Sequence, residues 1–509
     1  MLAKIHTIAL AGVDGLAVEV EVDIANGLPA FSTVGLAEGA VRESKDRVKA
    51  AIKNSGYNFP NRRITVNLAP ADLKKAGTSY DLPIAIGIMA ADQPFNQDKL
   101  ANMVLAGELS LDGKLRAVQG ILPMVTAARD IGKKAILVPQ DNAREAAMVT
   151  GIEVYGLDSL DQAVEFLVDR LKIPVVTARQ HWSSCPVSGP DFSDVKGQEH
   201  VKRAMEVAAA GSHNILLSGS PGSGKTMLAK RLATILPDLS LEEALETTKV
   251  YSIMGLLAAD QGLVRQRPFR APHHTISDAG LIGGGNQPKP GEVSLAHNGV
   301  LFLDEFPEYK KHVLEVLRQP MEDGTVTISR ASTSLDFPAR FMLVAAMNPC
   351  PCGHLGDDLH GCTCNDLQIK RYRHKLSGPL LDRIDIHLEV PAVPFKEMTH
   401  GPAGESSAAI RKRVIAARAR QSARFKGRRR LYANSQMSSA DLKKYCVVEP
   451  SGLTLLEQGM ARLGLSARAY NRILKIGRTI ADLAGQEQIT AAHIAEALQY
   501  RRIDRRAAI

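Results

Sequence analysis

Apolar and polar residues follow two different periods along the first part of the chain. Short apolar or alternating runs predict β-strands at residues 5–11, 17–24, 64–68, 104–106 and 135–138. Apolar positions at helical spacing predict α-helices at residues 38–54, 82–91 and 121–130. Because strands and helices are interspersed, residues 1–172 are expected to form an α/β domain with its own core.

This pattern is interrupted once and then resumes. Residues 173–190 contain Pro, Ser and Gly without a sustained period, which predicts a linker. Residues 191–394 return to buried strands and helices and predict a second α/β domain. Residues 395–509 are almost wholly helical in pattern. The chain is therefore expected to have an N-terminal α/β domain, an α/β core and a helical C-terminal region.

One segment of the second domain carries the strongest chemical signal. It follows the apolar run 214–217, precedes a helical pattern at 227–236 and satisfies the phosphate-loop pattern G-x-x-x-x-G-K-[ST]. In this context backbone N–H groups and a helix N-terminus bind phosphate groups. Lys225 is expected to reach the β- and γ-phosphates of ATP, and Thr226 to hold Mg²⁺. The predicted ATP-binding residues are Gly219, Ser220, Pro221, Gly222, Ser223, Gly224, Lys225 and Thr226.

Two later strands supply the groups that hydrolysis needs. Residues 300–305 form an apolar run that ends in Asp304 and Glu305, the Walker B pattern. Asp304 is expected to hold Mg²⁺ through water, and Glu305 to polarise the attacking water as a general base. The apolar run 340–348 ends in Asn348, which is expected to orient that water beside the γ-phosphate.

Two arginines complete the predicted catalytic set. Arg383 fits an arginine finger that enters the site of a neighbouring subunit, and its alternative is a structural salt bridge to Asp382 or Asp385. Arg468 begins a helix of the C-terminal region and is a candidate second sensor of the γ-phosphate.

Composition and charge narrow the class of protein. The 509 residues are 45% hydrophobic and 23% charged, and no apolar run approaches the ~18 residues that cross a bilayer. The first residues lack the apolar core of a signal peptide, so we expect a cytoplasmic protein without a membrane partner. The net charge is +9, and residues 411–430 contain ten basic residues and no acidic residue.

The basic segment 411–430 predicts a polyanionic partner, with a solvated face or a subunit contact as the alternative. Its candidate DNA contacts are Arg411, Arg413, Arg428, Arg429 and Arg430. Residues 310–322 are expected to form one helix. Residues 325–337, between this helix and the Asn348 strand, predict a β-hairpin with Arg330 near its tip as a DNA contact. Residues 267–287 add Arg270, His273 and His274 as pore candidates; the two histidines could instead be metal ligands.

Four of the six cysteines form two C-x-C pairs within residues 350–364. Thiolates clustered in one short loop suit a structural, tetrahedral Zn²⁺ site, with free surface thiols as the alternative. The candidate ligands are Cys350, Cys352, Cys362 and Cys364, and His354 or His360 could replace one cysteine.

The order of the phosphate loop, Asp-Glu strand, Asn strand, finger arginine and helical lid resembles the AAA+ ATPases. A closer and highly specific resemblance is to the magnesium-chelatase-like ATPases of the YifB/ComM family. It spans essentially the whole chain and is carried by residues 269–277, 283–285, 290–300, 347–353, 466–475 and 478–483.

This resemblance implies a hexameric motor that uses ATP and Mg²⁺. The ComM members of the family are DNA helicases that drive branch migration when incoming single-stranded DNA is integrated during natural transformation. Forked or three-stranded DNA is therefore an expected substrate. The alternative is a remodelling ATPase that acts on a protein or chelatase partner.

The N-terminal domain resembles the protease domain of Lon, a ribosomal-S5-like fold, at residues 104–121 and 135–142. Lon-type proteolysis needs a serine nucleophile that a lysine activates. The position expected to carry that lysine holds Met124, which leaves Ser79 without a base. We therefore expect a catalytically inactive domain, followed by an AAA+ α/β core and a C-terminal helical lid.

Overall fold

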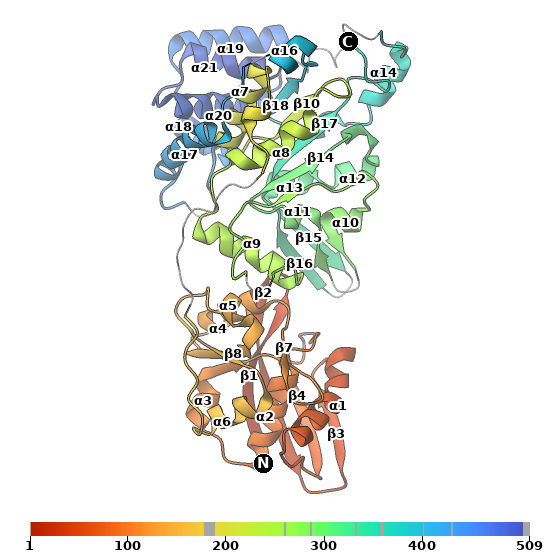
Figure 1. The fold of residues 1–509 in the computed structure, drawn as a ribbon, viewed down its shortest axis with the longest axis vertical. Coiled ribbons are helices and arrows are strands. Elements are labelled where there is room, and N and C mark those ends of the chain that lie inside the picture. The colour runs from red at the N-terminus through yellow and green to blue at the C-terminus, as the bar shows by residue number, and fades with distance from the viewer. Residues whose placement is uncertain are drawn as a thin grey trace. The chain divides into compact units, whose positions relative to one another are not determined.

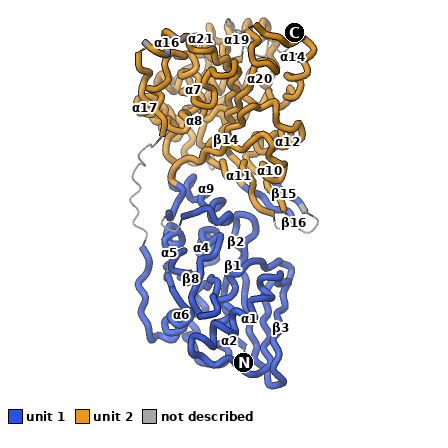
Figure 2. The backbone as a smooth tube through the Cα atoms, turned by 45° about the vertical axis from the view of Figure 1, so that its right-hand side comes forward, with its two compact units in different colours: residues 1–183, 241–264, 327–337 blue, residues 184–240, 265–326, 338–509 orange. Residues whose placement is uncertain are grey.

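The computed structural model describes residues 2–177, 189–258, 261–285, 288–330, 333–356, 361–400, 402–428 and 431–501. The chain forms two compact units, which Figure 2 colours separately. The first comprises residues 1–183, 241–264 and 327–337, and the second comprises residues 184–240, 265–326 and 338–509. Residues 241–264 and 327–337 lie in the range expected for the second domain, but they group with the first unit.

A seven-stranded sheet with the order β3-β4-β2-β1-β5-β8-β9 forms the centre of the first unit (Figure 1). Strand β2 pairs antiparallel with β1 and β4, and the remaining neighbours pair in parallel. Apolar side chains alternate inward along the antiparallel strands, as the period of two predicted. The strands are β1 (Leu2–Ala11), β2 (Asp14–Ala25), β3 (Ala30–Val34), β4 (Arg63–Ala69), β5 (Met103–Leu105), β8 (Ala135–Pro139) and β9 (Glu153–Leu157), with a separate pair β6 (Glu108–Leu109) and β7 (Leu115–Arg116).

The helices of the first unit include one core helix, α2 (Asp81–Asp92), which is buried along most of its length because it is apolar all round. The others are α1 (Gly39–Asn54), α3 (Gln97–Asn102), α4 (Ile121–Asp130), α5 (Gln140–Ala146), α6 (Leu160–Leu167) and α9 (Leu241–Ile253). Two contacts hold the end of α9: Ser252 O accepts from Gly120 N (3.0 Å), and Ser252 Oγ donates to Glu145 Oε1 (2.5 Å). The predicted hairpin is present as β15 (Thr325–Arg330) and β16 (Thr333–Pro338).

The second unit is built on a parallel sheet with the order β11-β14-β17-β10-β18. Its inner strands are apolar on both faces, as expected for a parallel sheet covered on both sides. The strands are β10 (Ile215–Ser218), β11 (Phe269–Arg270), β14 (Val300–Leu303), β17 (Met342–Met347) and β18 (Ile386–Glu389), with a small pair β12 (Gly283–Gly284) and β13 (Lys289–Pro290).

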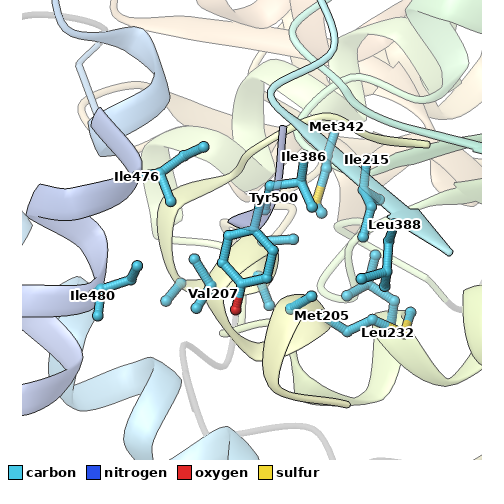
Figure 3. Packing of buried hydrophobic residues seen from close by; sticks show 14 of the residues in the cluster. Met205, Val207, Ile215, Leu232, Met342, Ile386, Leu388, Ile476, Ile480 and Tyr500 are labelled. Carbon is cyan, nitrogen blue, oxygen red and sulfur yellow. The ribbon is translucent and has the colours of Figure 1, made fainter. Parts of the chain in front are cut away.

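Helices of the core and of the C-terminal region pack into one hydrophobic cluster. Figure 3 shows Ile215, Met342 and Ile386 of the sheet in the same cluster as Ile476 and Ile480 of α20. Around the sheet lie α7 (Glu199–Gly211), α8 (Lys225–Ile235), α10 (Asp278–Ile282), α11 (Glu292–Leu295), α12 (Lys311–Glu315), α13 (Arg318–Asp323), α14 (Asp366–Arg373) and α15 (Gly378–Leu381). The C-terminal helices are α16 (Phe395–His400), α17 (Ser407–Arg424), α18 (Ser439–Tyr445), α19 (Pro450–Leu463), α20 (Ala467–Ala484) and α21 (Ala491–Gln499).

The predicted mixed α/β architecture with a helical C-terminal region is confirmed. One element differs: residues 310–322, expected as a single helix, form the two short helices α12 and α13. Pro320 has no N–H to donate to the carbonyl of Val316, which interrupts the helix there. In the parts of the chain that the structure describes, no helix has the length and apolar content needed to span a membrane.

Candidate nucleotide site

The phosphate loop connects β10 to α8 in the strand–loop–helix arrangement expected from the sequence. Gly222 (φ +80°) and Gly224 (φ +90°) occupy the left-handed region, which side chains with a Cβ rarely adopt. A Cβ on Gly219 would lie 2.3 Å from the carbonyl oxygen of Val390. These glycines therefore allow the tight loop that phosphate binding at the start of α8 requires.

Lys225 is the first residue of α8, and its ammonium group lies inside this loop. Nζ donates to the carbonyl oxygens of Gly219 (2.7 Å) and Ser220 (3.0 Å) and to Oδ1 of Asn348 (3.2 Å). Burial lowers the pKa of Lys225 below 10.5, and the charge of Asp304 opposes this effect. The structure thus brings the predicted phosphate-binding lysine and the predicted water-orienting amide together.

The Mg²⁺ candidates also meet. Thr226 Oγ1 donates to Oδ2 of Asp304 (2.6 Å), and a hydroxyl beside a carboxylate offers the oxygen ligands that Mg²⁺ prefers. Because β10, β14 and β17 are parallel, the residues that follow their carboxyl ends lie at one edge of the sheet. Glu305 follows Asp304 in a left-handed conformation (φ +51°), and its Oε2 lies 3.1 Å from Nδ1 of His274. This pairing gives His274, a predicted pore residue, a place beside the catalytic candidates.

The two predicted arginines are elsewhere. Arg383 is 8% exposed and donates to the carbonyl oxygen of Pro379 (2.6 Å) and to Glu322, rather than pairing with Asp382 or Asp385. Arg468 is exposed in the first turn of α20. Within the described ranges, neither arginine has a hydrogen bond or ion pair to the residues at the phosphate loop.

One residue at the loop was missed by the sequence analysis. Gln198 Nε2 donates to the carbonyl oxygens of Ser223 (3.2 Å) and Pro391 (2.7 Å), which ties the phosphate loop to the segment after β18. Gln198 has a left-handed backbone (φ +55°) at the start of α7. Neither apolar periodicity nor a known spacing marks such a position.

The four cysteines converge. Their sulfurs all lie within 4.8 Å of one another, and Cys350 Sγ is 3.4 Å from Cys352 Sγ and 3.7 Å from Cys362 Sγ. Tetrahedral zinc with Zn–S bonds of about 2.3 Å requires S–S separations near 3.8 Å, so the cluster fits this ion. Hydrogen bonds from the backbone at His354 and Thr363 lower the pKa of Cys352 to about 5, which favours its thiolate. A backbone hydrogen bond to each of Cys362 and Cys364 is outweighed by burial and the neighbouring sulfurs, which raise their pKa values, so these two thiols would become thiolates on binding a cation.

The same loop touches the phosphate loop. A Cβ on Gly353 would lie 2.6 Å from both Cδ and Cγ of Pro221 and 3.9 Å from Cγ of Asn348. The backbone after Cys352 therefore packs directly against a residue of the predicted ATP site. His360, the other candidate ligand, is outside the described residues.

Most described arginines of the predicted DNA contacts are paired within the chain. Arg411 lies 2.6 Å from Asp238, Arg413 lies 2.5 Å from Glu206, and Arg428 lies 3.2 Å from Asp441. Arg270 is 2.6 Å from Glu292, and His273 Nδ1 is 2.9 Å from Thr275 Oγ1. Arg429, Arg430 and the side chain of Arg330 fall outside the described parts of the structure.

Comparisons with known proteins agree along the whole chain. Family profiles match residues 191–398 ("Magnesium chelatase, subunit ChlI"), 20–142 ("Subunit ChlI of Mg-chelatase") and 404–501 ("Magnesium chelatase, subunit ChlI C-terminal"). The chain is 46% identical to Competence protein ComM of Haemophilus influenzae over 98% of this chain and 97% of that protein. It is also 46% identical to YifB of Salmonella typhimurium, over 99% and 98%. The Magnesium-chelatase 38 kDa subunit of Cereibacter sphaeroides is 27% identical over 31% of this chain and 52% of that subunit.

Proposed function

The chain belongs to the YifB/ComM family of magnesium-chelatase-like AAA+ proteins, and on that premise we propose that it is an ATP-hydrolysing DNA motor. AAA+ membership implies ATP and Mg²⁺ as its nucleotide and ion. We propose that it assembles as a homo-hexamer, unwinds DNA and promotes branch migration during recombination of incoming DNA. The observation that carries the hydrolysis part is the convergence of Lys225, Thr226, Asp304 and Asn348 at one edge of the sheet.

Each of these side chains has a proposed role in hydrolysis. Lys225 holds the β- and γ-phosphates, while Thr226 and Asp304 hold Mg²⁺, which neutralises phosphate charge when it is bound. Glu305 accepts a proton from the attacking water, and Asn348 positions that water. The contact between His274 and Glu305 would orient this carboxylate.

The two remaining arginines have proposed roles that depend on the ring. Arg383 would leave Glu322 and enter the site of a neighbouring subunit, and Arg468 would reach the γ-phosphate from the helical lid. Mixing Arg383→Ala subunits with Lys225→Ala subunits tests the first assignment. Partial recovery of ATP hydrolysis supports action in trans, whereas activities that merely average contradict it.

DNA as the substrate rests on the similarity to the Haemophilus relative, Competence protein ComM, and on the positive charge of the chain. The test is unwinding of labelled forked and three-stranded DNA with ATP. Lys225→Ala should abolish it, and Glu305→Gln should bind ATP without turning it over. ATP-dependent separation of strands by the wild-type protein supports the proposal, and its absence on every substrate contradicts it.

A second candidate, an ATPase that remodels a protein or chelatase partner, is favoured by one observation. Arg411 and Arg413 of the basic segment are engaged by Asp238 and Glu206, which leaves them less able to bind a polyanion. The two functions differ in one simple measurement. Stimulation of ATP hydrolysis by single-stranded or forked DNA favours the motor, and indifference to all nucleic acids favours remodelling.

We also propose a structural Zn²⁺ in the four-cysteine cluster. Cys350, Cys352, Cys362 and Cys364 would hold it as thiolates, and it would fix the loop beside Pro221. Elemental analysis of purified protein should find about one zinc per chain, and Cys362→Ser should lose it. A zinc-free wild-type protein with four titratable thiols would contradict the site.

For the N-terminal domain we propose a role in assembly or DNA handling without proteolysis. Met124 is 2% exposed in α4 and Ser79 is 6% exposed, so neither is presented to a peptide. Casein degradation that requires ATP and is lost in Ser79→Ala would overturn this assignment.

A further inference from the structure

A cleft with a basic rim lies in the second unit, next to the segment that carries Asp304 and Glu305. Its volume is about 540 Å³. One wall is residues 307–311, which follow directly after the Walker B carboxylates, and the other is the end of α14 and the turn after it. Its ionisable side chains other than Tyr309 are one carboxylate, Glu308, and five basic groups: Lys310, Lys311, Arg371, His374 and Lys375.

Most of this positive charge is not used inside the chain. Lys375 pairs with Glu308 at 3.1 Å, but both side chains are nearly half exposed, and such surface pairs contribute little. Lys310, Lys311, Arg371 and His374 are exposed, and among the described residues none has an ion pair or side-chain hydrogen bond. The rim therefore differs from Arg411 and Arg413, which have carboxylate partners.

The frame that carries these side chains is rigid. Tyr309 is 3% exposed, and its hydroxyl donates to the carbonyl oxygen of Pro272 (2.6 Å). On the other wall, α14 begins with a capping box between Asn365 and Gln368, directly after Cys364. Tyr372, 7% exposed, lies beneath Lys375, whose Nζ is 5.7 Å from the ring centroid. Fixed walls set the spacing of the backbone positions that carry the cations, so only the side chains need to be ordered when a ligand binds.

The ligand that fits is a phosphate chain. Three lysines and one arginine around an open cleft match repeated phosphate oxyanions, which these two residue types bind. A volume of about 540 Å³ is in the range of ligand sites and is much larger than one ion needs. We propose that this cleft binds phosphate groups outside the phosphate loop, from either the backbone of a nucleic-acid strand or a nucleotide held by a second copy of this chain.

The cleft lies close to Glu305 along the chain, so a ligand bound there would affect the segment that carries this residue. Pro307 of the cleft is two residues from Glu305, and the buried Phe306 between them fixes this short segment. A ligand held by Lys310 and Lys311 would restrain the same segment that presents the proposed general base. The inference deepens the proposed function by naming where the motor contacts phosphate beyond its own nucleotide, and it rests on that function.

The test compares two charge reversals in the full-length protein. Lys310→Glu with Lys311→Glu changes the cleft, and Lys443→Glu with Lys444→Glu changes an exposed adjacent pair on α18 by the same charge. Affinity for a fluorescent oligothymidylate is measured by anisotropy at several salt concentrations, and ATP turnover is measured without DNA. Thermal melting checks that both proteins are folded, and Arg371→Glu on the opposite wall should repeat the effect of the cleft pair.

Three outcomes are distinguished. If the source is a nucleic-acid backbone, the cleft variant loses about tenfold or more in affinity, and its salt dependence falls by about one to two ions released. If the source is a neighbour's nucleotide, DNA affinity is kept, turnover falls, and mixing with Lys225→Ala subunits restores part of it. If the cleft variant matches the control pair in both measurements, the proposal is overturned.

The proposed DNA-motor function can be refuted independently of the cleft. A wild-type protein that neither binds DNA nor is stimulated by it contradicts the DNA motor, whatever the cleft variants do. Phosphate binding by the cleft is then tested by the turnover and mixing measurements, which need no DNA.

Discussion

The contact between the cysteine loop and the phosphate loop predicts that Gly353→Ala weakens nucleotide binding. Gly353 has φ +86°, and its added Cβ would lie 2.6 Å from Cδ and Cγ of Pro221. Carbon atoms in contact normally lie about 3.5–4.0 Å apart, so one loop must move by about 1 Å. Overpacking of this size costs about 1–3 kcal/mol, and the left-handed backbone adds about 1–2 kcal/mol for any residue with a Cβ.

Gly356 is a matched control for the backbone cost. It lies in the same loop with φ +80°, and nothing is within 4 Å of its Cβ position. Gly356→Ala therefore carries the left-handed cost without the overlap, and the two variants should differ by about 1–3 kcal/mol. If Pro221 yields, Gly353→Ala should bind a fluorescent ATP analogue roughly tenfold more weakly than Gly356→Ala. Equal affinities of the two variants would refute the reasoning, because the cysteine loop would then have moved alone.

Three other predictions concern buried charge and the metal. Burial acts to raise the pKa of Asp385, but the hydrogen bond with His213 and nearby positive charge hold it below 3.8. The ionised carboxylate therefore stabilises the fold above pH ~4, and this stabilisation is lost as the pH falls through the folded-state pKa. Asp385→Asn should lower the melting temperature at pH 7, with a loss of up to about 3–5 kcal/mol, and the difference from wild type should narrow as the pH falls below ~4. Burial raises the pKa of Glu145 above 4.5 despite its hydrogen bond from Ser252. The contribution of Glu145 to wild-type stability should therefore fall as the pH rises from ~4.5. Glu145→Gln should reduce this pH dependence of the melting temperature. Removing the proposed Zn²⁺ with a chelator should weaken ATP-analogue binding about as much as Gly353→Ala does. Unchanged affinity in zinc-free protein would show that the cysteine cluster does not affect the nucleotide site.

Local patterns of this sequence predict the parts of the fold that depend on neighbours along the chain. The run before Gly219, the helix after it and the apolar strand before Asp304 each need only a few adjacent residues, and each is present. The hairpin at 325–337 is likewise a local signal. The break within residues 310–322 is also a local effect, because Pro320 cannot donate a hydrogen bond inside a continuous helix.

The contacts that join distant segments could not be predicted in the same way. Gln198 contacts the phosphate loop and the segment after β18 through its side chain. Gly353 packs against Pro221 of the loop because it has no side chain. Residues 241–264 read as part of the second domain, yet the hydrogen bond between Ser252 and Glu145 helps to hold them in the first unit. Such pairings depend on where the chain returns in space, and no period or spacing in one sequence records that.

Which charged residues pair with one another is likewise not predictable from the sequence alone, and the pairs seen in the structure lead to a final prediction. The basic segment 411–430 is dense in sequence, but Arg413 binds Glu206, which is 4% exposed, across 207 positions. Lys310 and Arg371 are far apart in sequence, yet they line one cleft and have no acidic partner among the described residues. Arg413→Gln should therefore destabilise the protein by at least about 1 kcal/mol, because it leaves a buried carboxylate with less compensation, whereas Lys310→Gln should leave the melting temperature unchanged. If the cleft binds a nucleic-acid backbone, DNA affinity should respond in the opposite order. If only Arg413→Gln lowers DNA affinity, and its melting temperature is unchanged, the basic segment contacts DNA. That result would contradict the structural role of Arg413 and the assignment of DNA binding to the cleft.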